Sequence, residues 1–435
     1  MKAKTMDPRK VQQTERQPAH EEGEHSAPFH RGYFPAFRSF QYRDYLCLWL
    51  GTVFSFLAVG MQRITRAWLV LRLTNDSPFA LSLVIVSFTL PLTFVSVLGG
   101  VFADRISRRQ IILIAQSGNA ILTFLLATLD MMNIICFWHL LVIGFCNGTL
   151  AAFNMPSRQS IISDIVPEQN LMNAISLSSA GMNLTNILGP VLAGVFIVYL
   201  DTAGVFYLIA LFHAFSVVCT ILIKAGRTPS AVSPRKGMWV DLREGFQYAA
   251  GNPTLLGLVI MGLVPALFGF TYLNLLPVWG REVLDAPSDG LGLLMAFVGI
   301  GALIGTLVLA SLPYLKRRGS FLMVNGFVWG IALIAFSLCN SYITALPALL
   351  LIGFLSAIFM SLNMTLMQFY SSPEMRGRIV SMSMMTFGIM PLSTVPFGIL
   401  AESIGTADSL KFSGLLLCLF IIVFFFAFRR FRKVA

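Results

Sequence analysis

The residues of this sequence that could bind a ligand are a few charged and polar side chains inside long apolar stretches. Arg63 and Arg66 lie in the apolar stretch 46–70, and His213 lies in the middle of 203–224. A guanidinium can donate paired hydrogen bonds to carboxylate or catecholate oxygens, and an imidazole can titrate near neutral pH. All twenty Asp and Glu, in contrast, can be placed in the first 45 residues, in loops or at the ends of apolar stretches. These positions predict a cavity that favours anionic or neutral ligands over cations.

Each of these side chains also has an interpretation without a ligand. Arg63 and Arg66 could extend to a membrane surface, and His213 could bond a neighbouring helix. Asn183 and Asn186 are three residues apart, so on a helix they share one face. They either line the cavity or bond a neighbouring helix. The candidate cavity residues are Gln62, Arg63, Asn183, Asn186 and His213.

The sequence contains no catalytic or metal-binding pattern. It has no HExxH helix, no phosphate-binding P-loop, no nucleophile elbow and no constellation of paired carboxylates. The six cysteines fall in or at the edges of apolar stretches, without metal-type spacing. We therefore expect no enzyme activity, no metal and no cofactor. Without a P-loop, ATP is not the direct energy source, so we expect coupling to an ion gradient.

The composition indicates a membrane protein. Of the 435 residues, 56% are hydrophobic and 12% are charged, and the mean hydropathy is +0.76; soluble domains carry about 25% charged residues. A helix needs about 20 apolar residues to cross a bilayer core of about 30 Å. The sequence has twelve such stretches, at 46–70, 80–102, 110–131, 134–154, 174–199, 203–224, 255–279, 290–314, 319–338, 342–366, 377–400 and 411–428. The predicted fold class is an all-α integral membrane protein with twelve transmembrane helices.

The basic residues predict the orientation of these helices. Of the 31 Lys and Arg, eighteen fall in the even-numbered loops and the C-terminal tail, whereas three fall in the odd-numbered loops. Because basic loops stay in the cytoplasm, both termini are expected to be cytoplasmic. Anionic lipid headgroups are sufficient partners for the net charge of +11. The lipid bilayer is therefore an expected partner and nucleic acid is not.

An internal repeat divides the chain into two halves. The loop after the fourth stretch reads NMPSRQSIISDIVPEQNLMNAIS, and the loop after the tenth reads NMTLMQFYSSPEMRGRIVS, with matching residues 206 to 209 positions apart. Two pseudo-symmetric six-helix halves around a midplane cavity are typical of secondary transporters. The expected organisation is a disordered cytoplasmic arm (1–45), an N-terminal half (46–224), a cytoplasmic loop (225–254), a C-terminal half (255–428) and a basic cytoplasmic tail (429–435).

Three motifs resemble a known transporter family. Residues 99–109, GGVFADRISRR, resemble the loop 2–3 motif of the major facilitator superfamily, with Ser107 where the family usually has glycine. The segments GMQRITRAWLVLRLTNDSPFALSL, PSRQSIISDIVPEQNLMNAISL and LGPVLAG are similar to a bacterial subgroup of drug, macrolide and siderophore exporters that includes the enterobactin exporter. The resemblance covers approximately residues 40–430 and implies the major facilitator fold.

The resemblance implies a latch on the inner side of the membrane. In the family, the acid that corresponds to Asp104 meets the positive N-terminal end of the eleventh helix, here near 376–379, and holds the halves together when the protein faces outward. In the alternative interpretation the motif only anchors the topology, which explains the arginines but not Asp104. The residues assigned to this inner latch are Gly100, Asp104, Arg105, Arg108, Arg109 and Arg158.

The segment GMNLTNILGPVLAG looks like the antiporter motif of the family, with Ala193 where a second glycine is common. Pro190 lacks a backbone N–H and interrupts the helix, and Gly181, Gly189 and Gly194 permit close packing. A bent, tightly packed helix would limit leakage and favour export. The alternative is an ordinary proline kink.

Together, the residues and the resemblance predict a secondary active exporter. We expect it to move a small amphipathic molecule, neutral or anionic, out across the cytoplasmic (inner) membrane of a bacterium by alternating access. A siderophore is the leading candidate, protons are the expected coupling ion, and the protein is expected to be a monomer. The alternatives are multidrug efflux of lipophilic compounds, an importer or facilitator on the same fold, and a membrane protein that transports nothing.

Overall fold

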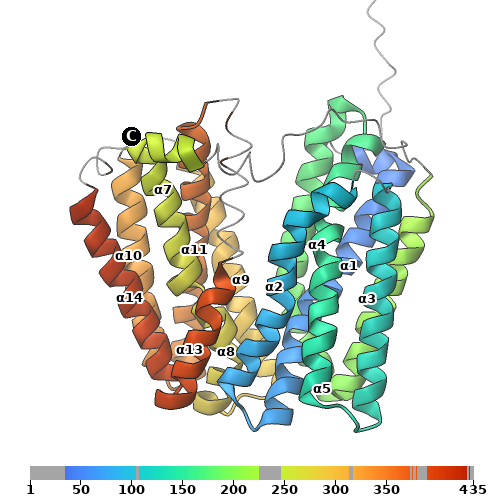
Figure 1. Cartoon of the computed structure of the whole chain (residues 1–435), viewed down its shortest axis with the longest axis horizontal. Helices are drawn as coiled ribbons and strands as arrows, with labels where there is room; N and C mark the ends of the chain where they lie inside the picture. Colours follow the sequence, from blue (N-terminus) through green and yellow to red (C-terminus); the bar gives the residue numbers. More distant parts are fainter. Residues whose placement is uncertain are drawn as a thin grey trace, which may run out of the picture.

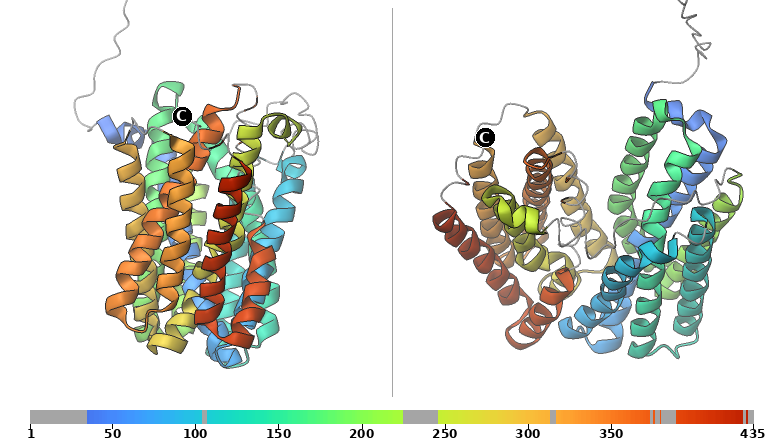
Figure 2. Two further views of the ribbon diagram at one scale, coloured as in Figure 1. Left: turned by 90° about the vertical axis from the view of Figure 1, so that its left-hand side faces the viewer. Right: turned by 45° about the horizontal axis from the view of Figure 1, so that its top comes forward.

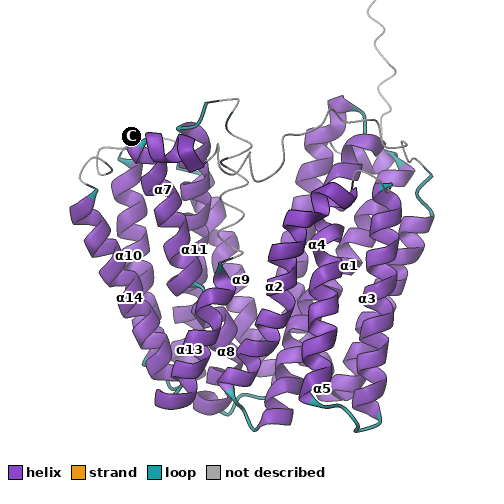
Figure 3. Cartoon of the chain, viewed as in Figure 1, coloured by secondary structure: helices purple, strands orange, loops and turns teal. Residues whose placement is uncertain are grey.

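A computed structural model shows the chain as an assembly of long helices (Figure 3). It describes residues 35–103, 107–224, 246–312, 317–372, 375, 379, 389–428 and 431. Within these ranges every regular element is a helix and no strand occurs. The predicted all-α class is therefore confirmed.

The N-terminal half consists of five continuous helices. They are α1 (Arg43–Thr74), α2 (Pro78–Ala103), α3 (Arg108–Met131), α4 (Phe137–Ile165) and α5 (Glu168–Ile221). The 54 residues of α5 are too many for one membrane crossing. At Asp201 the backbone leaves helical geometry, with φ 54° and ψ 178°, and the Asp201 carboxylate accepts the N–H of Thr202 at 2.6 Å. The element α5 is therefore two helices, and the half has six spans.

The C-terminal half begins with three short elements in succession: α7 (Pro253–Val264), the π-helical turn η3 (Pro265–Gly269) and α8 (Thr271–Leu284). Pro265 cannot donate a backbone hydrogen bond, which favours a change of helical geometry at this residue. The remaining helices are α9 (Ser288–Ala310), α10 (Arg318–Ser337), α11 (Tyr342–Phe369), α13 (Met390–Ile404) and α14 (Thr406–Ala427).

The number of spans agrees with the sequence. Ten helical segments of the described chain are long and apolar enough to cross a membrane, with α7, η3 and α8 counted together as one. One of the ten is α5, which contains two spans, and α13 is a shorter apolar helix. These elements account for the twelve predicted spans.

The two halves repeat the same internal packing. In the N-terminal half α2 contacts α4, where a Cβ on Gly148 would lie 2.0 Å from the carbonyl oxygen of Phe88. In the C-terminal half α9 contacts α11, where a Cβ on Gly301 would lie 2.0 Å from the carbonyl oxygen of Leu350. In both halves the second and fourth spans thus cross at a glycine, because only a residue without a side chain allows so close an approach.

The halves form two separate bundles that meet at one end (Figure 1). The helix pairs α5–α9 and α2–α13 make most of the contact between them. The right-hand view of Figure 2 also shows the bundles diverging toward the end that carries η2 (Pro35–Gln41). The contact end is therefore the end away from the chain termini.

Helical structure begins earlier than the predicted boundary at residue 46. The 3-10 helix η2 packs on α5, where Ser39 Oγ donates to Asn173 Oδ1 at 2.7 Å. The ring of Phe40 lies 5.0 Å from the ring of Trp49 in α1. Packing of these side chains on α5 and α1 explains why the expectation of a disordered arm is wrong for residues 35–45. Residues 1–34 lie outside the described part.

Candidate functional site

The two halves contact each other through glycines of α5 and α9. A Cβ on Gly194 would lie 2.6 Å from the carbonyl oxygen of Ser288. A Cβ on Gly292 would lie 3.0 Å from the carbonyl oxygen of Pro190. The C-terminal end of the predicted antiporter motif therefore lies directly against the other half.

The same motif packs against α1 on its other side. A Cβ on Gly189 would lie 2.8 Å from the Cα of Gly60, and a Cβ on Gly181 would lie 3.1 Å from a methyl carbon of Val53. The backbone stays helical through Pro190, since the non-helical residue inside α5 is Asp201. The structure thus places the motif glycines where α5 is enclosed between α1 and α9.

Polar contacts close the same end of the molecule. Arg281 of α8 forms an ion pair with Asp76 at 2.8 Å, and its guanidinium lies 4.8 Å from the centroid of the Trp68 ring. The carboxylate of Glu402 in α13 accepts from Ser77 Oγ at 2.8 Å and from the N–H of Phe79 at 3.3 Å. Because Ser77 and Phe79 form the N-terminal end of α2, this carboxylate also lies at the positive end of the helix dipole.

The inner latch is described only in part. Asp104 and Arg105 lie outside the described residues, and Gly100 belongs to α2 but its surroundings are not described. Arg108 forms an ion pair with Asp164 at 2.8 Å. Arg109 donates to the carbonyl oxygen of Ile221 at 2.7 Å. Both arginines therefore bind within their own half.

Arg158 is buried in the N-terminal half rather than placed at its boundary. Its side chain donates to Asn154 Oδ1 at 3.1 Å, to Thr52 Oγ1 at 2.9 Å and to Ser216 Oγ at 2.7 Å. These three partners come from α4, α1 and α5, and all are uncharged. The assignment of Arg158 to a latch between the halves thus has no supporting contact among the described residues.

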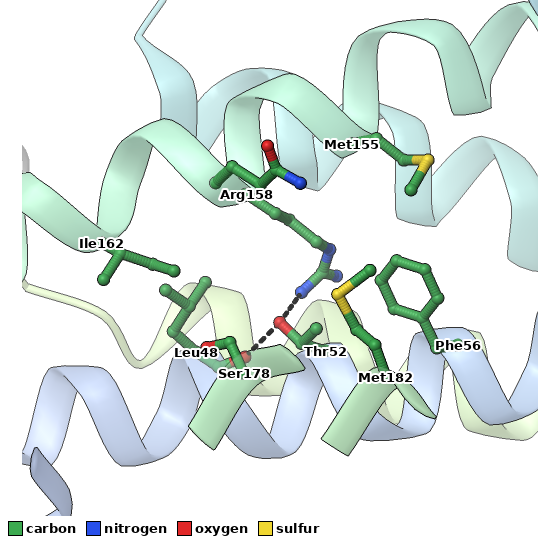
Figure 4. A pocket seen from close by; sticks show the side chains of 9 residues that line it. Leu48, Thr52, Phe56, Met155, Arg158, Ile162, Ser178 and Met182 are labelled. Carbon is green, nitrogen blue, oxygen red and sulfur yellow. Dashed lines mark hydrogen bonds between the residues drawn. The ribbon is translucent and has the colours of Figure 1, made fainter. Parts of the chain in front are cut away.

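A pocket opens beside the Arg158 guanidinium (Figure 4). In Figure 4 the guanidinium points toward Thr52, and Phe56, Met155 and Met182 lie beside it. Met155 is exposed at the rim whereas Arg158 is buried. The pocket lies between α1, α4 and α5, and its lining combines apolar with polar groups: Leu48, Thr52, Phe56, Met155, Arg158, Gln159, Ile162, Ser178 and Met182.

Arg63 and Arg66 differ in their surroundings although both belong to α1. Arg63 is the only exposed residue in the stretch 47–71, and it has no hydrogen-bond partner among the described residues. Arg63 follows Phe56 by seven residues, so it lies two turns farther along the same helix face. Arg66 is buried and donates to Asn147 Oδ1 at 2.9 Å. Asn147 in turn donates to Asn119 Oδ1 at 2.7 Å.

Gln62 and His213 connect helices inside the N-terminal half. Gln62 donates to Thr123 Oγ1 at 3.2 Å. Nδ1 of His213 lies 2.8 Å from Gln116 Oε1, and the Gln116 amide donates to Ser55 Oγ at 2.9 Å. The side chains of Gln62 and His213 are both buried. The interpretation in which His213 bonds a neighbouring helix is therefore the one that the structure shows, and the lining of the pocket includes neither residue.

Asn183 and Asn186 are exposed on α5. Ile187 of α5 packs against α9, since a Cβ on Gly299 would lie 2.7 Å from its side chain. Asn183 precedes Ile187 by one turn and Asn186 precedes Pro190 by one turn, so both lie on the α5 face that turns toward the other half. They are exposed because the halves diverge beyond Ile187.

The sequence profile of the MFS_3 family, described as transmembrane secretion effectors, matches residues 35–434. The chain belongs to this family of major facilitator transporters. The transporter is 26% identical to the staphyloferrin A transporter of Staphylococcus aureus, over 87% of this chain and 94% of the relative. It is 25% identical to the enterobactin exporter EntS of Salmonella typhi, over 65% of this chain and 67% of the relative.

Solved structures confirm the fold of the transporter. A bacterial homologue of the human lysosomal transporter Spinster, in an inward-facing and unoccupied conformation, superposes with a TM-score of 0.73, at 16% identity, over 92% of this chain and 99% of that chain. The nucleoside transporter NupG superposes with a TM-score of 0.68, at 18% identity, over 90% of this chain and 100% of that chain. The two six-helix halves of the transporter are therefore those of the major facilitator fold.

The charges embedded in the transporter are asymmetric. Every described Asp and Glu lies within one turn of a helix end, and the embedded charges of the described spans are Arg63, Arg66 and Arg158. All three belong to the N-terminal half. No ion-pair partner lies within 4.0 Å of any of them among the described residues. Among the described residues, the N-terminal half therefore carries embedded positive charge without an ion-pair partner, and the described spans of the C-terminal half do not.

Reasoning from the sequence missed the uncharged partners of these arginines. The sequence predicts no role for these partners, which all lie in apolar stretches: Asn154, Thr52, Ser216, Asn119 and Asn147. One signal could have identified Asn154, because it precedes Arg158 by four residues and i,i+4 pairs meet on a helix. The other partners come from different helices, and no spacing in the sequence relates them.

Proposed function

We propose that this transporter exports a small anionic or neutral amphipathic molecule of the siderophore class across the bacterial inner membrane by alternating access. The observation that supports this proposal best is the uncompensated positive charge of Arg63, Arg66 and Arg158 in the N-terminal half. An anionic cargo gains charge-assisted hydrogen bonds from such groups. A lipophilic cation loses its hydration and meets no embedded carboxylate among the described residues in return.

Arg63 is the proposed cargo contact in the centre of the membrane. It is exposed and has no partner among the described residues, whereas Arg66 is bonded to Asn147. A guanidinium is planar and offers a fork of donors that fits carboxylate or catecholate oxygens. The names of the relatives, a staphyloferrin A transporter and an enterobactin exporter, agree with a cargo of this kind.

The arrangement of the halves supports alternating access with the cytoplasmic side open. If the termini are cytoplasmic, as the distribution of basic residues predicts, the closed end bearing Arg281, Asp76 and Glu402 faces outward. The exposed Asn183, Asn186 and Arg63 are then accessible to cargo from the cytoplasm. A proton gradient is the proposed energy source. The closely packed α5 between α1 and α9 would limit leakage during export.

Transport into everted membrane vesicles tests the proposal. The substrates are a carboxylate siderophore, a catecholate siderophore, their neutral esterified or alkylated analogues, and a quaternary ammonium dye. We expect saturable uptake of an anionic substrate that Arg63→Gln weakens more than Arg66→Gln does. Arg43→Gln is the matched control, because Arg43 is exposed at the first turn of the same helix. Saturable dye uptake that Arg63→Gln leaves unchanged would refute the proposed preference for anionic cargo.

A further inference from the structure

We infer that the pocket beside Arg158 is a second, inner anion subsite, which receives the carboxylate or catecholate group of the cargo before Arg63 does. This inference rests on the proposed export of anionic cargo and adds the place at which recognition begins. The residues that carry it are Arg158 and its uncharged partners, together with the pocket rim in Figure 4.

The charge of Arg158 is not balanced by an acidic partner among the described residues. The side chain is 4% exposed, and its three hydrogen-bond acceptors are an amide and two hydroxyls. A guanidinium has five N–H donors, so two N–H groups remain without an acceptor among the described residues. A buried charge is costly when nothing of opposite sign compensates it, and an anion in the adjacent pocket would supply that charge.

The duplicated half carries no charge at the position that corresponds to Arg158. Asn154 and Arg158 of α4 correspond to Asn363 and Met367 of α11, each 209 residues later. In α11 the Asn363 amide N–H donates to Met367 Sδ at 3.8 Å, so the i,i+4 contact forms there without a charge and with the hydrogen bond in the opposite direction. Met367 is also buried. The fold therefore does not require an arginine at this position, and the charge in α4 calls for a different explanation.

The pocket lies nearer than Arg63 to the end at which the halves diverge. Thr52, which contacts Arg158, precedes Arg63 by eleven residues, so the two lie about 16 Å apart along α1. Thr52 is closer to the end at which the halves diverge, and Phe56 lies between it and Arg63 on the same helix. Cargo that arrives from the diverging end thus reaches the Arg158 pocket first and Arg63 second.

Substitution of Arg158 by methionine tests the subsite, because it removes the guanidinium and introduces the side chain that α11 carries at the corresponding position, Met367. Thr52 Oγ1 donates to the carbonyl oxygen of Leu48 at 2.7 Å, and Ser216 Oγ donates to that of Gly51 at 2.7 Å. Both hydroxyl donors therefore stay satisfied in Arg158→Met, and Asn154 can contact the new methionine as Asn363 contacts Met367. Arg158→Lys is the second variant, because it keeps the charge and loses the planar fork.

The measurement is the protection of a cysteine at the pocket rim. Met155→Cys in the reconstituted full-length transporter is modified with N-ethylmaleimide, and each site is quantified by mass spectrometry. The native Cys136 is exposed and lies at the start of α4, at the other end of the helix, so it is an internal control. The probes are citrate and 2,3-dihydroxybenzoate as anions, catechol as a neutral compound and tetramethylammonium as a cation.

We expect at least one anion to slow modification of Met155→Cys and not of Cys136. Arg158→Met should raise the protecting concentration by about tenfold or more, which corresponds to the loss of one charge-assisted hydrogen bond. Arg158→Lys should have an intermediate effect, and Arg63→Gln a smaller one. Absence of protection by both anions, or protection that Arg158→Met leaves unchanged, would overturn the inference even if vesicles export anionic cargo through Arg63. Arg158-dependent protection without any vesicle transport would instead contradict the proposed function alone.

Discussion

Adding one methyl group at Gly194 should change the balance between the two conformations of the transporter. In the present structure that methyl carbon would lie 2.6 Å from the carbonyl oxygen of Ser288 and 3.1 Å from the Cα atoms of Asp289 and Gly292. All three atoms belong to the backbone of α9, so no side chain can rotate away. Because carbon atoms prefer separations of about 3.5–4.0 Å, α5 and α9 must move apart by approximately half an ångström or more.

The energetic cost of this contact falls on one conformation only. Overpacking of this kind costs about 1–3 kcal/mol, and a free-energy difference of that size shifts a two-state equilibrium by about 5–150-fold. The cost applies while α5 and α9 are in contact at the closed end, and the proposed alternating access would separate them. The helix propensity gained from Gly→Ala is equal in both conformations and cancels. Gly194→Ala should therefore populate the conformation that is open at this end.

A buried cysteine at the closed end measures the shift. Ser82 is 1% exposed and packs against Gly398 of α13, so Ser82→Cys should react slowly with a membrane-impermeant maleimide. Gly194→Ala should accelerate this reaction by about fivefold or more. The control is Gly251→Ala, since a Cβ at Gly251 meets no atom within 4 Å. Equal labelling rates in the two backgrounds, at equal expression, would refute the argument from packing.

Three further predictions concern the contacts between the halves. Glu402→Gln removes the negative charge at the N-terminal end of α2, which costs the closed end about 0.3–1 kcal/mol of stabilisation. This variant should accelerate Ser82→Cys labelling by a smaller factor than Gly194→Ala does. An unchanged labelling rate would contradict this prediction. Asp104→Asn should leave the protein folded in the membrane and sharply reduce transport in vesicles, and normal transport by a well-expressed variant would mean that the motif is only an anchor. Pro190→Ala should abolish export or permit a passive leak, measured as substrate loss from preloaded liposomes. If export and leak are both unchanged, Pro190 contributes only to helix packing.

The fold was predictable from the sequence because each span is set by local composition. Apolar runs separated by charged or turn-forming residues show where a helix crosses the bilayer, independently of its neighbours. The break at Asp201 was placed correctly between two stretches for this reason, although the helix continues to the residue before it. The start of the fold was not placed correctly, because Phe40 becomes half-buried through ring contacts with Tyr45 and Trp49 that the sequence does not reveal.

The types of residue in the candidate site could be predicted from the sequence, but their hydrogen-bond partners could not. The sequence shows that Arg63 and His213 lie in apolar stretches, but helix rotation decides which of them is exposed. His213 bonds Gln116 of α3 and Arg63 bonds nothing among the described residues. Arg158 was assigned by motif to the inner latch, and only the assembled half shows that α1 and α5 supply its acceptors. Helices that are far apart in the sequence contact each other without a characteristic residue spacing, so their contacts cannot be predicted from the sequence.

The contact of Glu402 with α2 gives the predicted inner latch a structural counterpart. At the closed end a carboxylate of α13 meets the N-terminal end of α2. The inner latch would use the same two spans with their roles exchanged, since Asp104 follows the C-terminal end of α2 and is expected to meet the N-terminal end of the eleventh span. The halves diverge at that end here, so one contact is made while the other is predicted to be broken. Each carboxylate would then stabilise a different conformation by about the same small free energy. Two contacts of similar strength would leave neither conformation strongly preferred, so a cargo anion at Arg63 or Arg158 would shift the equilibrium toward whichever conformation binds it more tightly.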